Sequence, residues 1–248
     1  MKARTIANFL DDLLKVKKIK DKSKNGLQVN SKNDILKVGF AVDACLSTAE
    51  LAKKKKIDLL VVHHGLVWKN RFNSYGLNTL TKKYLKKYNI ALYAVHLPLD
   101  MHHVYGNNIQ LANILGLAKI SKFGKYKGRA IGYRGVLKKS ASIDKIAKLL
   151  NRKLRTKCKV LNYGKSNIRS IGIVSGGGSD SFQEAKDLDL FIIGDAPYHT
   201  FRFTRDFKRN TIILGHYASE TVGVKSLMPL IKKTFKVEVV FLDNPLEG

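Results

Sequence analysis

Two adjacent histidines stand at the end of an apolar segment of the sequence. Residues 57–62 read Ile-Asp-Leu-Leu-Val-Val and run directly into His63, His64 and Gly65. A short apolar run rich in β-branched residues is typical of a buried parallel strand, and ligand sites of open α/β sheets lie at the carboxyl ends of such strands. Neighbouring side chains on a strand point to opposite faces, but both imidazoles can enter one cavity where the strand breaks into a loop. We therefore expect this pair to bind metal, one ion per imidazole.

Two further apolar segments end in the same kinds of residue. The first leads into His96, and Asp100 follows four residues later. The second leads into His216, and Glu220 follows four residues later. If a helix begins near His216, this spacing places His216 and Glu220 on one helical face.

Imidazole nitrogens and carboxylates in this mixture are ligands that suit zinc, iron or manganese. For any one of these histidines alone, burial or simple solvation is the more common explanation. The collection of such residues at three strand ends favours a metal site. His96 is close enough in sequence to Asp100 to act as a general acid or base, or as a supplementary ligand.

Several motifs together resemble the GTP cyclohydrolase 1 type 2 family, also called the Nif-three-like family. The matching segments are residues 25–29, residues 38–44 with Asp43, the His63-His64 pair, His96 to Asp100 followed by Gly106-Asn107-Asn108, Gly194-Asp195, and Gly215-His216 with Glu220. Gly65 follows the histidine pair where many members have a proline, which alters the stiffness of the loop but not the ligand chemistry. The chain resembles the short form of the family, without an inserted central domain.

This resemblance implies a dimetal-dependent hydrolase that acts on a nucleotide-like substrate, by hydrolytic opening of the GTP imidazole ring. It implies two divalent cations per chain, which lower the pKa of a water between them, and a homohexameric ring with the sites facing an internal cavity. Glu220 would bridge the two ions and would count, with His96, among the catalytic residues. The implied metal ligands are His63, His64, Asp100, His216 and Glu220.

The chain is strongly basic. Lys and Arg number 46 against 19 Asp and Glu, which gives a formal net charge of +27. A basic surface attracts nucleic acid or nucleotide triphosphates, although lysine runs such as residues 53–56 are also typical of solvated helix faces. An alternative function is therefore a basic, ring-shaped nucleic-acid-binding protein with a structural or vestigial metal site. The sequence lacks an aromatic-rich recognition motif, which counts against dedicated sequence reading.

The charge by itself predicts that the protein binds DNA or RNA with little sequence preference and a steep salt dependence, because lysines that contact phosphates release counterions. A labelled oligonucleotide titrated between about 50 and 200 mM salt should lose affinity by orders of magnitude. Tight binding that persists at high salt, or that prefers one sequence, would contradict this expectation.

Strand-like and helix-like segments alternate along the chain, which is typical of an α/β protein. We expect two α/β lobes with mixed or mostly parallel sheets flanked by helices and a dimetal site between the lobes. Gly124 to Gly128 reads as the boundary, so residues 1–124 carry the histidine pair and residues 125–248 carry the Gly-His-x3-Glu motif. The expected helices lie near 6–14, 47–55, 76–88, 106–114, 142–151, 179–187, 198–207 and 217–232. The expected strands lie near 36–43, 58–63, 90–96, 129–137, 157–162, 168–175, 189–194, 210–215 and 236–242.

No apolar stretch of the sequence approaches the ~20 residues of a membrane span, and the first residues read as an amphipathic helix rather than a signal peptide. We expect no membrane partner and a cytoplasmic protein, with Cys45 and Cys158 as reduced thiols.

Two loops leave alternatives open. The glycine-rich segment 175–181 could cradle an anion with backbone N–H groups, or could form a tight strand-to-helix turn. Asp195, at the end of the next expected strand, could contact substrate or cap a loop. Trp68, Arg71 and Phe72, after the histidine pair, could stack on a purine or pack their loop down.

Overall fold

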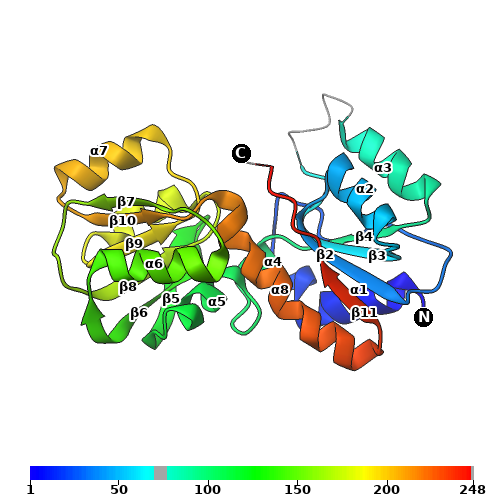
Figure 1. The fold of residues 1–248 in the computed structure, drawn as a ribbon, viewed down its shortest axis with the longest axis horizontal. Helices are drawn as coiled ribbons and strands as arrows, with labels where there is room; N and C mark the ends of the chain where they lie inside the picture. Colours follow the sequence, from blue (N-terminus) through cyan, green and yellow to red (C-terminus); the bar gives the residue numbers. More distant parts are fainter. Residues whose placement is uncertain (70–76, 247–248) are drawn as a thin grey trace. The chain divides into compact units, whose positions relative to one another are not determined.

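The computed structural model describes residues 1–69 and 77–246, which form two compact units (Figure 1). Unit 1 comprises residues 1–99 and 224–246, and unit 2 comprises residues 100–223. Each unit contains one sheet flanked by helices, so the predicted α/β class with two helix-flanked sheets is confirmed. Among the described residues, no helix is long and apolar enough to cross a membrane.

Unit 1 is built on a five-stranded sheet with the order β1-β4-β3-β2-β11. Strands β2 (Lys37–Asp43), β3 (Leu59–His64), β4 (Ala91–Ala94) and β11 (Glu238–Phe241) run parallel, and β1 (Gly26–Val29) is antiparallel to β4. Its helical segments are α1 (Ala3–Leu13), the 3-10 turn η1 (Val16–Lys18), α2 (Leu46–Lys54) and α3 (Leu77–Lys87). Two more helices, the short α4 (Leu97–Asp100) and the long α8 (His216–Phe235), carry the chain across the division between the units.

The central strand β3 is buried along its whole apolar length, because helices cover the sheet of unit 1 on both faces (Figure 1). Leu60 and Val62 pack with Ala49 of α2 and Leu85 of α3. Helix α1 lies on the other face of the sheet. Burial on both faces explains why this strand reads as a continuous apolar run rather than an alternating one, and it holds the residues that follow in a fixed position.

Unit 2 is built on a six-stranded sheet with the order β5-β6-β8-β9-β10-β7. Strands β8 (Ile168–Val174), β9 (Leu190–Ile193) and β10 (Asn210–Ile213) run parallel. Strands β5 (Ala118–Tyr126) and β6 (Arg129–Ala141) form an antiparallel hairpin, β6 is antiparallel to β8, and β7 (Lys159–Asn162) is antiparallel to β10. The helical segments are α5 (Asn107–Ile114), α6 (Ile143–Leu154), the 3-10 segment η3 (Gly178–Ala185) and α7 (Tyr198–Asp206).

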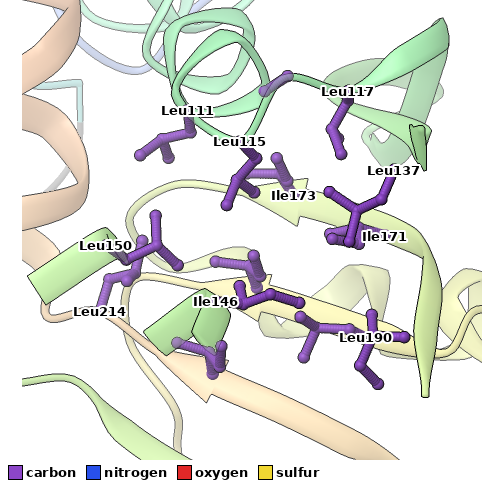
Figure 2. Close-up of a cluster of buried hydrophobic side chains, with 14 of the residues drawn as sticks. Leu111, Leu115, Leu117, Leu137, Ile146, Leu150, Ile171, Ile173, Leu190 and Leu214 are labelled. Atoms are coloured by element: carbon purple, nitrogen blue, oxygen red, sulfur yellow. The ribbon is translucent and has the colours of Figure 1, made fainter. Parts of the chain in front are cut away.

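The core of unit 2 lies between its sheet and helices α5 and α6 (Figure 2). Ile171 and Ile173 of β8 face this core together with Leu111 of α5 and Leu150 of α6. The amphipathic pattern of α6 places its apolar side chains at helical spacing on this one face. Ser142 caps the helix by accepting a hydrogen bond from the backbone N–H of Lys145.

The division between the units differs from the single boundary that the sequence predicted near residue 124. Gly124 and Gly128 have positive φ angles and lie in the β5–β6 hairpin, inside unit 2. The C-terminal residues return to the first sheet, where Val239 of β11 pairs with Val38 of β2. A positive-φ glycine signals a turn, and a turn alone does not distinguish a hairpin from a link between domains.

The two units share one four-stranded arrangement. Strands β1 to β4 and strands β7 to β10 have the same chain order, the same neighbours and the same antiparallel first strand. In both, an aspartate before the third strand ties that strand to its parallel neighbour. Asp58 accepts the backbone N–H of Lys37 at 2.8 Å, and Asp189 accepts that of Ser170 at 2.9 Å.

Replacing Asp189 by alanine should destabilise unit 2 by about 2 kcal/mol near neutral pH, because three donors lose a charged acceptor. Burial alone would raise the pKa of Asp189, but hydrogen bonds from Ser170 and Arg169 outweigh it and hold the pKa below its ordinary value. The stabilisation is therefore present above the unfolded-state pKa of about 4 and is lost as the pH falls below it.

Chemical denaturation of the wild type and of Asp189→Ala at about pH 7 and about pH 3 measures this effect. Asp187→Ala removes a neighbouring exposed carboxylate and is the matched control. A stability difference that is as large at the acidic pH as at the neutral one would contradict the assignment.

Candidate functional site

Three histidines gather at one edge of the sheet in unit 1. His63 and His64 end β3, and His96 follows the neighbouring parallel strand β4. The ring centroids of His63 and His64 lie 4.6 Å apart, and those of His63 and His96 lie 5.1 Å apart. One ligand-capable atom from each of the three rings lies within 4.8 Å of the others. Parallel neighbouring strands thus bring residues that are distant in sequence to one ligand-binding edge.

The two histidines of the pair are oriented through Nδ1. In the buried His63, this nitrogen donates to the carbonyl oxygen of Val95 at 3.0 Å. In His64, it donates to the carboxylate of Asp43, the last residue of the adjacent strand β2, at 2.8 Å. Metal-binding histidines commonly donate their other ring N–H to such an acceptor, which fixes the tautomer. Nε2 is therefore the candidate ligand atom of both rings.

His96 is held by Asp21, a residue that the sequence analysis did not identify. Asp21 Oδ1 accepts a hydrogen bond from Nδ1 of His96 at 3.1 Å, and Asn25 Oδ1 accepts the backbone N–H of His96 at 2.7 Å. Burial alone would raise the pKa of Asp21, but the hydrogen bond and charge of His96, with bonds from Asn25 and Ser23, hold it well below its ordinary value. Asp21 lies in a polar loop with no strand or helix pattern, so no sequence signal marked it.

Trp68 packs beside these histidines. Its indole ring meets that of His96 edge-on, with centroids 5.0 Å apart, and its N–H donates to the carbonyl oxygen of Gly65 at 2.8 Å. These contacts tie the loop after the histidine pair to the cluster. Arg71 and Phe72, the other residues considered for purine stacking, lie outside the described residues.

A second set of candidate ligands lies in unit 2. Helix α8 begins at His216, as predicted, and Nε2 of His216 lies 3.3 Å from Oε2 of the buried Glu220. Nδ1 of His216 donates a short hydrogen bond to the carboxylate of Asp195, which follows β9. Burial alone would lower the pKa of His216, but Glu220 and Asp195 raise it to about 10. A metal ion that binds this imidazole would therefore displace a proton.

The glycine-rich segment brings the backbone close to Glu220. Gly176 has a φ of +58°, and a Cβ atom there would overlap Oε1 of Glu220 and lie 3.2 Å from Nε2 of His216. Its N–H donates to Oγ of Ser219 at 3.1 Å, and its carbonyl oxygen accepts the N–H of Gly178 at 3.0 Å. These N–H groups are engaged within the protein, and a 3-10 segment rather than an α-helix follows. The structure therefore favours a tight turn over an anion cradle.

Asp100 is buried at the end of α4 and is held by side chains of unit 2. Its Oδ1 accepts hydrogen bonds from Nδ2 of Asn107 at 2.8 Å and from Oγ of Ser175 at 3.3 Å. Asn108 accepts the backbone N–H of Ser175 at 2.6 Å. The Gly-Asn-Asn segment seen in the sequence therefore serves to position this carboxylate and the loop after β8.

The donor chemistry of these residues fits divalent cations. Unit 1 offers imidazole nitrogens, and unit 2 offers two buried carboxylates, Asp100 and Glu220, with one imidazole. Each of these imidazoles donates a hydrogen bond through Nδ1, and Asp100 accepts hydrogen bonds at Oδ1. Such bonds orient the ligands of metal sites generally. Asp100 stands four residues after His96, which follows β4. Glu220 likewise stands four residues after His216, which follows β10, and these two strands occupy the same place in the shared four-stranded arrangement. The protein thus contains histidine and carboxylate groups that could bind metal.

Comparison with known proteins gives relatives of nearly equal length. A protein of Pyrococcus horikoshii is 42% identical over 242 residues, which cover 97% of each chain. A protein of Archaeoglobus fulgidus is 37% identical over 247 residues, which cover 99% of each chain. Both carry the name GTP cyclohydrolase 1 type 2 homolog.

Solved structures give the same result. The crystal structure of TTHA1606 from Thermus thermophilus superposes with a TM-score of 0.91 over 100% of both chains at 33% identity. The protein ybgI, described as of unknown function, superposes with a TM-score of 0.92 over 100% of both chains at 27% identity. The family model described as Duf34/NIF3 (NGG1p interacting factor 3) matches residues 1–246. With nearly the whole chain matched, and with relatives of this identity and coverage, the protein belongs to the Duf34/NIF3 family.

Proposed function

We propose that the protein is a dimetal-dependent hydrolase that acts on a nucleotide-like substrate. The observation that carries this proposal is the cluster of His63, His64 and His96, whose Nδ1 atoms are all occupied by acceptor oxygens. Histidine ligands of metals are commonly oriented in this way, and the same orientation prepares an imidazole such as His96 to exchange a proton at Nε2. The names of the relatives, GTP cyclohydrolase 1 type 2 homolog, support a nucleotide-like substrate.

In this proposal, the protein binds two divalent cations, with zinc, iron or manganese as the metal. Glu220 would supply one of the carboxylates that hold these ions. Cations bound there would supply an activated water for hydrolysis near neutral pH. The proposed ligands are His63, His64, Asp100, His216 and Glu220.

The remaining polar residues orient groups and move protons. His96 is proposed as the general acid or base, because the ionised Asp21 fixes its Nδ1–H and leaves Nε2 as the nitrogen that exchanges a proton. Asp43 and Asp195 are positioning residues for His64 and His216. The formal charge of +27 favours the approach of an anionic substrate.

The test is to load purified protein with zinc, iron or manganese, to measure bound metal by elemental analysis, and to assay GTP and a panel of other nucleotides. We expect about two ions per chain and turnover of at least one nucleotide. Protein that binds no metal would contradict the dimetal assignment, and fully loaded protein that hydrolyses nothing in the panel would contradict the substrate class. Light scattering on the same preparation tests the homohexamer that forms part of this proposal.

A further inference from the structure

Unit 2 contains a cavity at the edge of its sheet opposite to its candidate metal ligands. The cavity lies at the amino ends of β9 and β10, whereas Asp195 and His216 follow the carboxyl ends of these strands. Its volume is about 500 Å³, within the usual range for small-molecule sites. The lining residues that matter here are Tyr163, Lys165, Asp187, Phe207, Lys208 and Arg209.

The segments that line this cavity are joined by hydrogen bonds to the buried Asn210. Its Nδ2 donates to the carbonyl oxygens of Lys165 at 2.7 Å and Asp189 at 3.1 Å, and its Oδ1 accepts the N–H of Gly164 at 2.8 Å. One amide side chain therefore joins three backbone segments. The lining residues project from a framework that is in place before any ligand arrives, which reduces the entropic cost of binding.

The cavity carries more positive than negative charge. Lys165, Lys208 and Arg209 line it, against two carboxylates, Asp187 and Asp189. Asp189 accepts hydrogen bonds from the backbone and hydroxyl of Ser170, and its Oδ1 lies 3.8 Å from Nζ of Lys165, so Lys208 and Arg209 supply the excess positive charge. Nε of Arg209 is a buried donor with no hydrogen-bond partner within the described part of the chain. Arg209 therefore contributes to the site through its positive charge, which attracts anions at a distance.

Two exposed aromatic rings stand beside these cations. Phe207 is 59% exposed and Tyr163 is 45% exposed. The ring of Phe207 stacks on that of Phe203, with centroids 5.8 Å apart and planes at 18°, and Phe203 stacks in turn on Phe182 at 5.9 Å. The stacking orients the ring of Phe207 while more than half of the residue stays exposed, and exposed aromatic rings beside cations are the groups that stack on nucleobases.

Helix α7 and the residues that follow it carry further basic and aromatic side chains. Between residues 198 and 209, basic residues outnumber the single acidic residue, Asp206, and the aromatic residues are interleaved with them. Tyr198, at the start of the helix, is 88% exposed. These rings are interleaved with charged residues and form no recognisable aromatic-rich motif in the sequence, and only their exposure shows that Tyr198 and Phe207 are not core residues. The excess of positive charge argues against a second copy of this basic chain as the occupant.

We propose that this cavity binds a nucleotide unit, with its phosphate at Lys165, Lys208 and Arg209 and its base on the ring of Phe207. The unit could belong to a single-stranded nucleic acid, for which α7 offers further cations and rings, or could be a free nucleotide. Double-stranded nucleic acid does not fit, because its bases are stacked within the helix and inaccessible to Phe207. The site is separate from the proposed hydrolytic residues, so its occupation does not depend on the proposed activity.

The experiment is a fluorescence-anisotropy titration of the full chain with a labelled single-stranded oligonucleotide and with its duplex. Phe207→Ala should weaken single-strand binding by about fivefold to a hundredfold, because it removes one base-stacking face. Phe207→Tyr keeps the ring and should restore the affinity. Lys208→Glu should weaken binding more than Lys54→Glu, which makes the same charge change at an exposed position on α2.

Competition with a free mononucleotide identifies the source of the ligand. Displacement of the oligonucleotide at similar nucleotide concentrations supports a free nucleotide, and failure to displace it supports a single strand. The proposal is overturned if Phe207→Ala binds like the wild type, or if Lys54→Glu weakens binding as much as Lys208→Glu, since affinity would then come from diffuse surface charge. Thermal melting confirms that the variants fold, and unchanged metal-dependent turnover in Phe207→Ala would separate this site from the proposed hydrolytic one.

Discussion

Glu220→Gln is expected to lower turnover by at least about a hundredfold and to reduce the bound metal below about two ions per chain, while the protein stays folded. Loss of a residue that merely supports a metal ligand already costs roughly 10- to 100-fold in affinity or activity. Loss of a carboxylate that would itself hold the cations should cost more, because glutamine keeps the shape of glutamate but lacks its negative charge. Elemental analysis, nucleotide turnover and thermal melting measure the three quantities on one preparation.

Glu50→Gln is the matched control for this substitution. Glu50 is exposed on α2, whereas Glu220 is 2% exposed and lies beside His216. The control should keep the metal content and the turnover of the wild type. A folded Glu220→Gln protein with wild-type turnover would exclude the dimetal mechanism, and unchanged metal content would remove Glu220 from the set of ligands.

His216→Asn should likewise reduce turnover by at least about a hundredfold, while the affinity for single-stranded nucleic acid changes little. The imidazole of His216 links Asp195 to Glu220, and asparagine cannot replace both ring nitrogens in that geometry. The residues proposed to bind nucleic acid lie at the amino ends of β9 and β10, whereas His216 follows the carboxyl end of β10, so the substitution should leave them unchanged. Parallel assays of hydrolysis and of oligonucleotide binding check both statements.

His199→Asn is the control for the hydrolysis assay, since His199 is an exposed histidine on α7 that contacts Phe203 rather than a candidate ligand. It should hydrolyse nucleotides like the wild type. If His216→Asn also keeps wild-type hydrolysis, the candidate ligands of unit 2 have no part in the chemistry. If its only defect is lower stability, binding becomes the favoured function over catalysis.

The sequence by itself determined the class of fold and most of its elements. Apolar runs such as residues 59–62 mark buried parallel strands, because a strand covered on both faces has no polar side. The helical spacing of α6, and the four-residue interval between His216 and Glu220, predicted helices that the structure contains. The segment near 179–187 is a 3-10 segment rather than a regular helix, a distinction that the spacing of apolar residues does not make. The 26–29 and 118–126 strands were missed, since the first is only four residues long and the second alternates irregularly between exposed and buried residues.

The candidate ligands were also visible in the sequence, because residues at strand ends carry a local signal: an apolar run that stops at a histidine. Their supporting residues carry no such signal. Asp21 reaches His96 across 75 residues, and Asn107 reaches Gly223 across 116. These contacts depend on how segments that are distant in sequence pack together, and no local pattern contains that information.

Tertiary structure alone decided three other features. The first of these is which residues belong to each unit. Strand β11 returns to the first sheet and pairs Val239 with Val38, so the C-terminal residues belong to unit 1. The shared four-stranded arrangement became visible only from strand order and direction. The exposure of Phe207 and Tyr163 beside three cations depends on side-chain burial, which is set by the packing of distant segments. The spacing of apolar residues shows which face of a segment can be buried. Only the packing of the folded chain determines which of these faces are covered.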